Sequence, residues 1–379
     1  MKDYIDVIEP KTGQHILVDY FSGTFPFICY EDDLELAVME DTLNEFASFF
    51  NYSKEEIIKN EYSSNRFLYQ YTIGEEITIR FMGPELKSGR QSCMIELKGK
   101  GCREFENKTN KSWKEFLEYF VIMHNVKPTR IDLVIDDYDG TIIHQKEVYK
   151  LVDAGYYTSV FRSEPKIIDN KTGGFTIQFG EHKSPQMLVI YDKLKEQRKK
   201  KQPVNQKYWC RYEMRFTHQK ANDIAFNIID TPTEEYPKFI YGLLYSMLDL
   251  KEVNTYSQES QYKVPTHPKW LKFLNDYEKA ILTKYDTNKK TYENYINYCQ
   301  PIIALYMFSS IIYNNYNIYQ TITDLLELTY TYMDNINKQK VQKINNYLTQ
   351  SINKQVTEKD IYEVKELLNK EILDRGLPF

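Results

Sequence analysis

The segments 129–137 (TRIDLVIDD), 186–193 (QMLVIYDK) and 209–216 (WCRYEMRF) alternate apolar side chains with charged or reactive ones. Successive residues of a β-strand point to opposite faces, so this period of two predicts three strands. Each strand would turn its apolar residues to one face of an antiparallel sheet. The opposite face would carry Arg130, Asp132, Asp136, Tyr191, Lys193, Arg211, Glu213 and Arg215.

Each of these segments has an ordinary explanation when it is taken alone. Charged residues that alternate with apolar ones commonly form the solvated side of a strand, and a tyrosine in a strand commonly serves packing. Taken together, however, carboxylates, arginines and a tyrosine on one face are the groups that metal-assisted phosphoryl transfer requires. We therefore interpret this face as an active-site face.

The order and spacing of the segments resemble a known family. Residues 174–197 (GFTIQFGEHKSPQMLVIYDKLKEQ), with 129–137 before them and 209–216 after them, are similar to the trans-acting replication initiators of small rolling-circle plasmids. This family includes relaxases of some integrative conjugative elements and phage-borne replication initiation factors. Residues 94–106 (MIELKGKGCREFE) resemble a segment typical of the phage and conjugative-element branch. The resemblance covers residues 14 to 230, approximately.

The resemblance implies a site-specific nickase that acts through a tyrosine. The tyrosine of the Tyr-x-Lys motif, Tyr191, would become joined to the 5′ phosphate of the DNA and leave a 3′-hydroxyl. Such a nick starts rolling-circle replication, or conjugative transfer if the protein is a relaxase. Related proteins often have an arginine two residues before the tyrosine, where this chain has Val189, so Lys193 or Lys183 would replace that phosphate contact.

A divalent metal is expected at the same face. Mg²⁺ or Mn²⁺ prefers oxygen ligands, which Asp132 and Glu213 could supply from different strands, with Asp136 as a third ligand or a base. The six histidines are scattered and lack the clustered pattern that many single-strand nickases use. The resemblance likewise implies ligation by carboxylates. The expected catalytic side chains are Tyr191, Lys193, Arg130 and Arg211.

DNA contacts are expected to be local, because the formal net charge of the chain is −5. A protein that simply coats DNA would be basic overall. The run 193–207 (KLKEQRKKKQPVNQK) is strongly basic and follows the candidate tyrosine directly, so it predicts a phosphate-binding flap rather than a merely solvated loop. The expected DNA-binding residues are Lys183, Lys195, Arg198, Lys199, Lys200, Lys201 and Arg215, and candidates for base stacking are Tyr157, Phe161, Phe175 and Phe179.

The fold class predicted from these patterns is α+β, with an antiparallel sheet as the nickase core and an all-helical C-terminal domain. Residues 1–250 would form the catalytic domain, with an internal repeat of one α+β unit over 14–110 and 128–230. The polar, proline-containing stretch 251–268 would be a linker. Residues 269–379 have helical periodicity and would serve DNA binding, oligomerisation or partner contact.

A cytoplasmic protein is expected. Five widely spaced cysteines without a C-x-x-C pair argue against a disulfide framework or a zinc site. The first residues lack the apolar core of a signal peptide, and the longest apolar run, 301–313, is too short and too polar to span a bilayer. Expected partners are single-stranded and origin duplex DNA, a host helicase and a second copy of the chain, but no membrane.

Two other classes stay open at this level. One is a non-catalytic origin-binding protein of the same fold, in which the acidic face has a structural role. The other is a metal-dependent nuclease that acts through water, in which Tyr191 is packing. A covalent DNA–protein product would distinguish the tyrosine enzyme from both.

Overall fold

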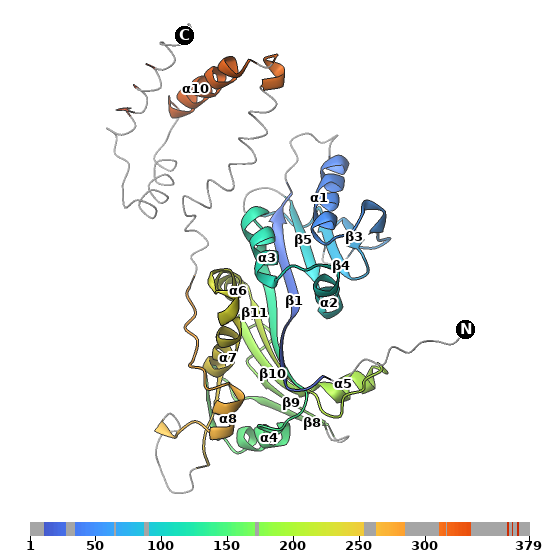
Figure 1. The fold of residues 1–379 in the computed structure, drawn as a ribbon, viewed down its shortest axis with the longest axis vertical. Coiled ribbons are helices and arrows are strands. Elements are labelled where there is room, and N and C mark those ends of the chain that lie inside the picture. The colour runs from blue at the N-terminus through green and yellow to red at the C-terminus, as the bar shows by residue number, and fades with distance from the viewer. Residues whose placement is uncertain are drawn as a thin grey trace, which may run out of the picture. The chain divides into compact units, whose positions relative to one another are not determined.

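A computed structural model describes residues 11–27, 35–63, 66–86, 91–170, 174–253, 263–284, 311–315 and 317–334, with 362, 363, 366 and 370 as single residues. The chain divides into two compact units, Met1–Lys284 and Tyr285–Phe379 (Figure 1).

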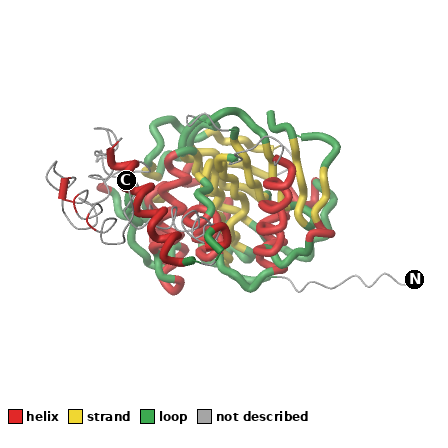
Figure 2. Tube along the Cα trace, turned by 90° about the horizontal axis from the view of Figure 1, so that it is seen from above, coloured by secondary structure: helices red, strands yellow, loops and turns green. Residues whose placement is uncertain are grey.

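In the described part of the chain, the first unit is built on a ten-stranded antiparallel sheet with the order β2-β3-β4-β5-β1-β6-β11-β10-β9-β8. Figure 2 shows strands and helices packed side by side in this unit. Its strands are β1 (Gln14–Pro26), β2 (Ile57–Lys59), β3 (Tyr69–Ile73), β4 (Ile77–Phe81), β5 (Ser92–Leu97), β6 (Lys127–Asp137), β8 (Lys166–Asn170), β9 (Gly174–Phe179), β10 (Gln186–Asp192) and β11 (Cys210–Thr217). A separate pair joins β7 (Tyr157–Ser159) to β12 (Leu248–Leu250). The predicted mixed fold with an antiparallel sheet is confirmed.

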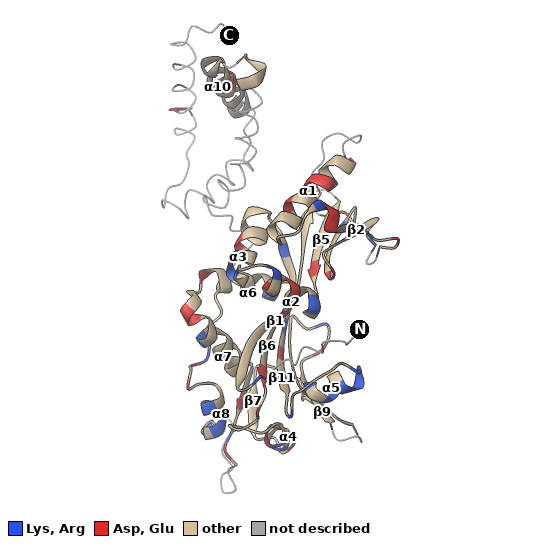
Figure 3. Cartoon of the chain, turned by 45° about the vertical axis from the view of Figure 1, so that its right-hand side comes forward, with Lys and Arg blue, Asp and Glu red and all other residues tan. Residues whose placement is uncertain are grey.

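Helices complete the first unit. They are α1 (Glu35–Phe49), α2 (Gly99–Lys108), α3 (Trp113–Leu117), α4 (Gln145–Asp153), α5 (Lys193–Lys199), α6 (Gln219–Asp230), α7 (Tyr236–Met247) and α8 (Pro268–Phe273), with a π-helical turn at Glu118–Met123 and 3-10 turns at Lys54–Glu56 and Thr233–Glu235. Helices α6, α7 and α8 run along one side of the sheet, and α5 lies on the other side (Figures 1 and 3). The sheet therefore has a helix-covered face and an open face.

The predicted alternation in β6 separates these two faces. Ile131, Leu133 and Ile135 are at most 1% exposed and belong to the main apolar core. On the same face, Phe21 of β1 meets Phe116 of α3 edge to face, with ring centroids 4.9 Å apart. The helices thus bury the apolar residues of the strands, which leaves the polar residues of the same strands on the open face.

The strand order is symmetric about the central β1–β6 pair. From β1 the order runs outward through β5, β4, β3 and β2, and from β6 it runs through β11, β10, β9 and β8. In each half the central strand is followed by a helix, and the later strands form a meander that returns to the central strand. This order supports the tandem repeat expected from the sequence, which stays a prediction.

In the sequence, Ser112 with Glu115 and Thr42 with Glu45 both have the spacing of a capping box at a helix start, but the two pairs differ in the structure. Ser112 and Glu115 form the predicted capping box of α3: the Ser112 hydroxyl accepts from the Glu115 amide at 3.2 Å, and Glu115 accepts from the Ser112 amide at 2.7 Å. The similar pair Thr42 and Glu45 does not start a helix. Helix α1 is already continuous there, and the Thr42 hydroxyl donates to the Val38 carbonyl at 2.8 Å.

Residues 263–284 are part of the first unit, although the sequence suggested a domain boundary at residue 250. Trp270 and Phe273 of α8 are fully buried and stack at a centroid distance of 5.2 Å. Phe273 also lies 4.8 Å from the ring of Tyr212, on the helix-covered face of β11. The prolines and polar residues of 251–268 have the composition of a linker, but they precede a segment that returns to the core.

We therefore expect the minimal stable fragment to end at residue 284 rather than at 250. A fragment of residues 1–250 loses Trp270 and Phe273, and removing one large buried aromatic side chain costs about 3–5 kcal/mol. Fragment 1–284 should unfold cooperatively in a circular dichroism melt, and Trp270→Ala should lower its midpoint by roughly 6–20 °C. A fragment 1–250 that melts as sharply and as late as 1–284 would contradict this boundary.

The second unit is described over α10 (Ile318–Asp334) and the short helical segment at 311–313. Within 269–379 the apolar periodicity predicts helices at 302–312, 322–333 and 361–372, and α10 includes the second of these. The other helices expected at 302–312 and 361–372 lie largely outside the described residues. Over the described ranges, every helix is too short or too polar to cross a bilayer.

Candidate active site

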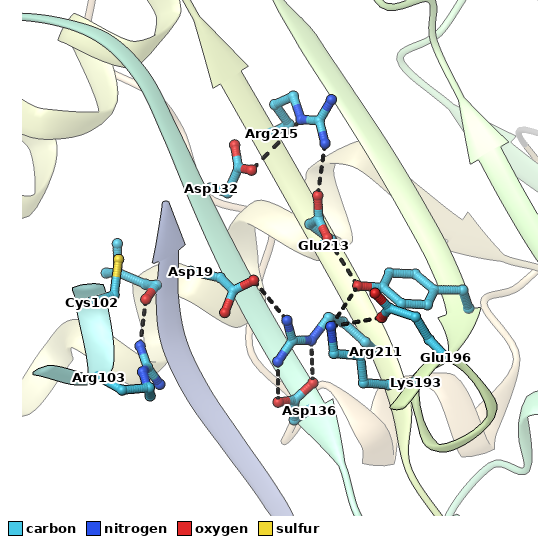
Figure 4. A network of polar contacts seen from close by, with 12 residues as sticks. Asp19, Cys102, Arg103, Asp132, Asp136, Lys193, Glu196, Arg211, Glu213 and Arg215 are labelled. Carbon is cyan, nitrogen blue, oxygen red and sulfur yellow. Dashed lines mark hydrogen bonds and ion pairs between the residues drawn. The ribbon is translucent and has the colours of Figure 1, made fainter. Parts of the chain in front are cut away.

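Polar side chains from β1, β6, β10, β11 and α5 gather on the open face of the sheet in a network of polar contacts (Figure 4). Asp19, Arg211 and Asp136 form one group of this network, and Asp132, Arg215, Glu213, Tyr191, Lys193 and Glu196 form the other. Antiparallel pairing sets their spacing: β11 lies between β6 and β10, with Arg215 opposite Asp132 and Arg211 opposite Tyr191. Directly opposed side chains have Cβ atoms about 4.5–5.5 Å apart, so three strands bring these groups into reach of one another.

Tyr191 lies at the end of β10, where its hydroxyl has two polar neighbours. It donates to Glu213 Oε2 at 3.2 Å, and Lys193 Nζ donates to it at 3.5 Å. Asp192 ends the strand by capping α5, because its carboxylate accepts from the Lys195 amide at 2.9 Å. This turn folds Lys193 back over the Tyr191 ring, with Nζ 5.6 Å from the ring centroid.

The environment of Tyr191 favours its protonated form. Burial is the largest cause that raises the pKa of the hydroxyl well above its ordinary value, and the charge of Glu213 raises it further. Arg211 acts in the opposite direction. The hydroxyl is therefore a poor nucleophile until a base accepts its proton or added positive charge stabilises the phenolate.

Asp132 is almost completely buried beneath two arginines. Arg130 donates through Nε to Oδ1 at 2.9 Å and also pairs with Oδ2, while Arg215 Nε lies 3.6 Å from Oδ2. The second nitrogen of Arg215 donates to Glu213 Oε1 at 3.0 Å, so this guanidinium joins the two predicted metal ligands. Burial raises the pKa of Asp132 to about 6, against the lowering effect of Arg130.

Asp136 does not fit the predicted role of third ligand or base. Arg211 donates to both of its oxygens, at 2.7 and 2.8 Å, and the side chain is 0% exposed. Arg211 also donates to Asp19 at 2.8 Å and is itself only 4% exposed. The predicted catalytic Arg211 is thus held inside the protein, and together with Asp136 it fixes β11 against β6.

The remaining predicted ligands, Asp132 and Glu213, are the candidates for holding a divalent cation. Within the described ranges, no cluster of three or more His, Cys, Asp or Glu side chains is placed to hold a metal. Asp132 and Glu213 both contact Arg215, and Mg²⁺ commonly binds one or two carboxylates and keeps several waters. Arg130 and Arg215, which cover Asp132, are 30% and 23% exposed and are therefore more easily displaced than buried Arg211. The donor set fits a two-carboxylate site.

A pocket of about 820 Å³ lies beside this network, between the open face of β9–β11 and helix α5. Its lining includes Tyr191, Glu213, Arg215, Lys195, Arg198, Lys199 and His182. Figure 3 shows the basic residues of α5 on this side of the sheet. Three residues of the expected DNA-binding set are not among the lining: Lys183 is exposed beside His182, Lys200 pairs with Glu196, and Lys201 is exposed after α5.

The aromatic residues considered for base stacking belong largely to the core. Phe179 is 0% exposed on the helix-covered face, where Tyr157 and Phe161 pack against it at centroid distances of 5.4 and 5.9 Å. Phe175 is 8% exposed and contributes to the pocket lining. Stacking by Phe179 is therefore excluded in this conformation.

Two members of the network were not among the predicted site residues. Asp19 lies at an irregularity of β1 between Val18 and Tyr20, which turns its carboxylate toward Arg211. Glu196 of α5 pairs with Lys193 at 2.7 Å. The predicted internal repeat offered a signal for Asp19, because it would align Val18-Asp19-Tyr20 with Ile131-Asp132-Leu133.

The fold and this site define a class: an α+β protein that places a tyrosine, carboxylates and arginines on the open face of a large antiparallel sheet. The sequence model of the replication initiation factors matches residues 126–326, and that of the N-terminal domain of rolling circle replication initiation proteins matches residues 16–121. The chain belongs to the replication initiation factor family. The resemblance inferred from the sequence is confirmed.

Two known proteins of this kind are similar to the chain. The chain is 35% identical over 138 residues to the inferred DNA relaxase NicK of Bacillus subtilis (strain 168), and the match spans 34% of this chain and 39% of NicK. A rolling circle replication initiator protein from Geobacillus stearothermophilus has a similar structure, with a TM-score of 0.56 and 20% identity. That similarity covers 72% of this chain and 100% of the other, and it supports the fold.

Proposed function

We propose that this protein is a site-specific single-strand DNA endonuclease and strand transferase, which nicks an origin through a 5′-phosphotyrosine on Tyr191 to start rolling-circle replication. The observation that carries the proposal is the position of the Tyr191 hydroxyl. It lies in the lining of a pocket with basic walls, between the carboxylate of Glu213 at 3.2 Å and the ammonium of Lys193 at 3.5 Å. Membership of the family supports it.

The surroundings of Tyr191 suit attack on a phosphodiester. The phenolic oxygen would form a bond to phosphorus while the bond to the 3′ oxygen breaks, and Glu213 is placed to accept the phenolic proton. The leaving 3′ oxygen takes up a proton and becomes the primer end for synthesis. Lys193 and Arg215 would stabilise the negative charge that develops on the phosphoryl oxygens. Because the phosphotyrosine bond conserves the energy of the cleaved linkage, the reverse reaction can rejoin strands.

Asp132 and Glu213 are the residues that would hold Mg²⁺ or Mn²⁺ in this proposal, and the ion would supply positive charge at the phosphate. The partly exposed Arg130 and Arg215 would then exchange contacts with the carboxylates for contacts with DNA phosphates. Arg211 and Asp136, as a buried pair, would hold the strands in register and would not touch the DNA.

A relaxase that starts conjugative transfer is the second candidate, and the similarity to NicK favours it. Both functions use the same nick, so the DNA that is cut distinguishes them. The purified protein should be incubated with Mn²⁺ and supercoiled DNA that carries its own gene and flanks. A nick with protein attached to the 5′ end is the expected product. A nick without attached protein would indicate a nuclease acting through water, and no nick at all would indicate an origin-binding protein.

Other parts of the proposal concern partners and location. The second unit, with α10, would contact origin duplex DNA, a second copy of the chain or a host helicase. A chain that nicks an intracellular origin would act in the cytoplasm. These assignments follow from the proposed function and can be tested by comparing the full chain with fragment 1–284 in duplex binding, assembly and helicase recruitment.

Arg198 and Lys199 are expected to bind DNA phosphates, because both line the pocket and are exposed. Arg198→Ala combined with Lys199→Ala should weaken binding of a single-stranded oligonucleotide on the order of 10-fold and reduce the salt slope of log K by about 1.4. Fluorescence anisotropy at roughly 50 to 300 mM salt measures the affinity and, from its dependence on salt, the slope that reports counterion release. Cleavage at saturating DNA should persist.

The matched control is Lys238→Ala with Lys272→Ala, which removes two exposed charges from α7 and α8 on the helix-covered side. This control should bind DNA as the unmodified protein does. An equal loss of DNA affinity in both double variants would show that the net charge of the protein, and not the position of Arg198 and Lys199 in the pocket, determines binding.

A further inference from the structure

A second cluster of tyrosine, glutamate and arginine lies on the open face, in the N-terminal half of the sheet. Tyr20 of β1 donates through its hydroxyl to Glu96 Oε1. Arg80 of β4 donates to the other carboxylate oxygen of Glu96 at 2.8 Å. Arg80 and Glu96 are 3% and 5% exposed, whereas Tyr20 is partly exposed. The proposed function assigns no role to this cluster.

Its bonding pattern is that of the Tyr191 site. There, too, the tyrosine hydroxyl donates to one oxygen of a glutamate, Glu213, while an arginine, Arg215, donates to the other oxygen at 3.0 Å. The two glutamates lie on β5 and β11, which hold equivalent places on either side of the central β1–β6 pair. The sheet therefore carries two tyrosines on one face, each paired with a glutamate that an arginine also holds.

The strand register places Tyr20 beside the predicted metal ligand. Tyr20 of β1 is directly opposite Asp132 of β6, and Asp132 is in turn opposite Arg215 of β11. The guanidinium of Arg130 lies 4.1 Å from the centroid of the Tyr20 ring and donates to Asp132 at 2.9 Å. Asp132 therefore lies between the two clusters. It accepts from Arg130, which lies over the Tyr20 ring, and it pairs with Arg215, which donates to Glu213.

We propose that Tyr20 is a second phosphoryl acceptor, which allows one chain to hold two cleaved DNA ends; this inference rests on the proposed function of Tyr191. After the first nick, the Tyr20 oxygen would attack a second phosphodiester and form a bond to phosphorus as the bond to its 3′ oxygen breaks. Glu96 accepts the phenolic proton. The released 3′-hydroxyl then attacks the phosphotyrosine on Tyr191, which joins the two DNA segments and returns a proton to Tyr191. Each phosphodiester bond that breaks is replaced by a newly formed phosphodiester bond, so no further reactant is needed.

Another tyrosine with a similar hydrogen bond serves as a comparison. Tyr52 donates to Glu104 at 2.6 Å, but Glu104 is held by the main-chain amides of Glu75 and Glu76 at 2.7 and 2.8 Å rather than by an arginine. Tyr52 also follows α1 and does not belong to the sheet. Tyr52→Phe therefore removes the same chemical group as Tyr20→Phe without touching the open face.

The test counts DNA fragments on single polypeptides. The full chain, with Mn²⁺, receives first one oligonucleotide with the mapped nick sequence and then a second oligonucleotide of different length, and intact-mass spectrometry under denaturing conditions reports the adducts. Before the released 3′-hydroxyl removes the first fragment from Tyr191, the unmodified chain and Tyr52→Phe should show polypeptides that carry both fragments, with one of them on the peptide that contains Tyr20. Tyr20→Phe should lower the ratio of double to single adducts at least on the order of 100-fold. The phenylalanine retains the ring beneath Arg130.

A Tyr20→Phe variant that keeps the double adduct would overturn the inference. So would an unmodified chain that carries a single adduct at most, because the second cleavage would then need a second copy of the protein. Failure of the first adduct to form on Tyr191 in the unmodified chain is a different result, which would overturn the proposed function and with it this inference.

Discussion

Tyr191→Phe is expected to lower the rate of nicking by on the order of 10³-fold or more and to abolish covalent attachment of the protein to DNA. The change removes a single oxygen, the atom that would bond to phosphorus. The ring remains in place, and Glu213 keeps its hydrogen bond from Arg215 at 3.0 Å. The lost hydrogen bond contributes about 1 kcal/mol, so the fold and DNA binding should survive.

This expectation is measured with labelled single-stranded DNA on denaturing gels, which separate free product from DNA attached to protein. Tyr245→Phe is the matched control, because its hydroxyl also has a polar partner, Thr266 at 2.9 Å, but lies on the helical side of the protein. The control should nick as the unmodified chain does. Continued nicking by Tyr191→Phe would instead assign the reaction to another tyrosine, and Tyr20 would be the first to examine.

The central strands could be predicted from the sequence because their periodicity is local. In β6 and β11, apolar residues alternate with charged ones in register with the pleat, so the sequence itself separates the two faces. The same argument brought Asp132, Glu213 and Tyr191 to one face, and the structure places them there. The distances between these side chains could not be predicted, because they depend on the order of the strands in the sheet, which the alternation of residues does not reveal.

Contacts between distant segments could not be predicted in this way. Arg211 appeared as one more charged residue on a solvated strand face, but it is buried because Asp136 and Asp19 neutralise it from two other strands. Asp19 lies 192 positions away in the sequence and is oriented by a local irregularity of β1. The packing of α8 against β11 is likewise a contact between distant segments. The polar composition of residues 251–268 does not indicate that the chain after them packs against the sheet.

Asp132→Asn and Glu213→Gln should each lower nicking on the order of 100-fold or more, because both changes keep the side-chain shape and remove the negative charge that binds a hard cation. Activity of the unmodified protein should be lost in EDTA and return with Mg²⁺ or Mn²⁺. Binding provides a readout that is independent of activity. At a concentration 100 times its Kd, Mn²⁺ should stabilise the unmodified fold by about 2.7 kcal/mol, and this gain should be absent in both variants.

Two further variants separate a metal site from general effects of charge. Glu147→Gln removes a carboxylate that pairs with Lys269 at 2.8 Å, away from the open face, and should change neither nicking nor Mn²⁺ binding. Asp136→Asn leaves Arg211 with a poorer partner in a buried position, and breaking such a pair costs about 3–5 kcal/mol, so its main effect should be a lower melting temperature. Full activity of Asp132→Asn and Glu213→Gln in EDTA would eliminate the two-carboxylate site. A loss of Mn²⁺ stabilisation in Asp136→Asn equal to theirs would show instead that Asp136 leaves Arg211 to take part in binding the ion.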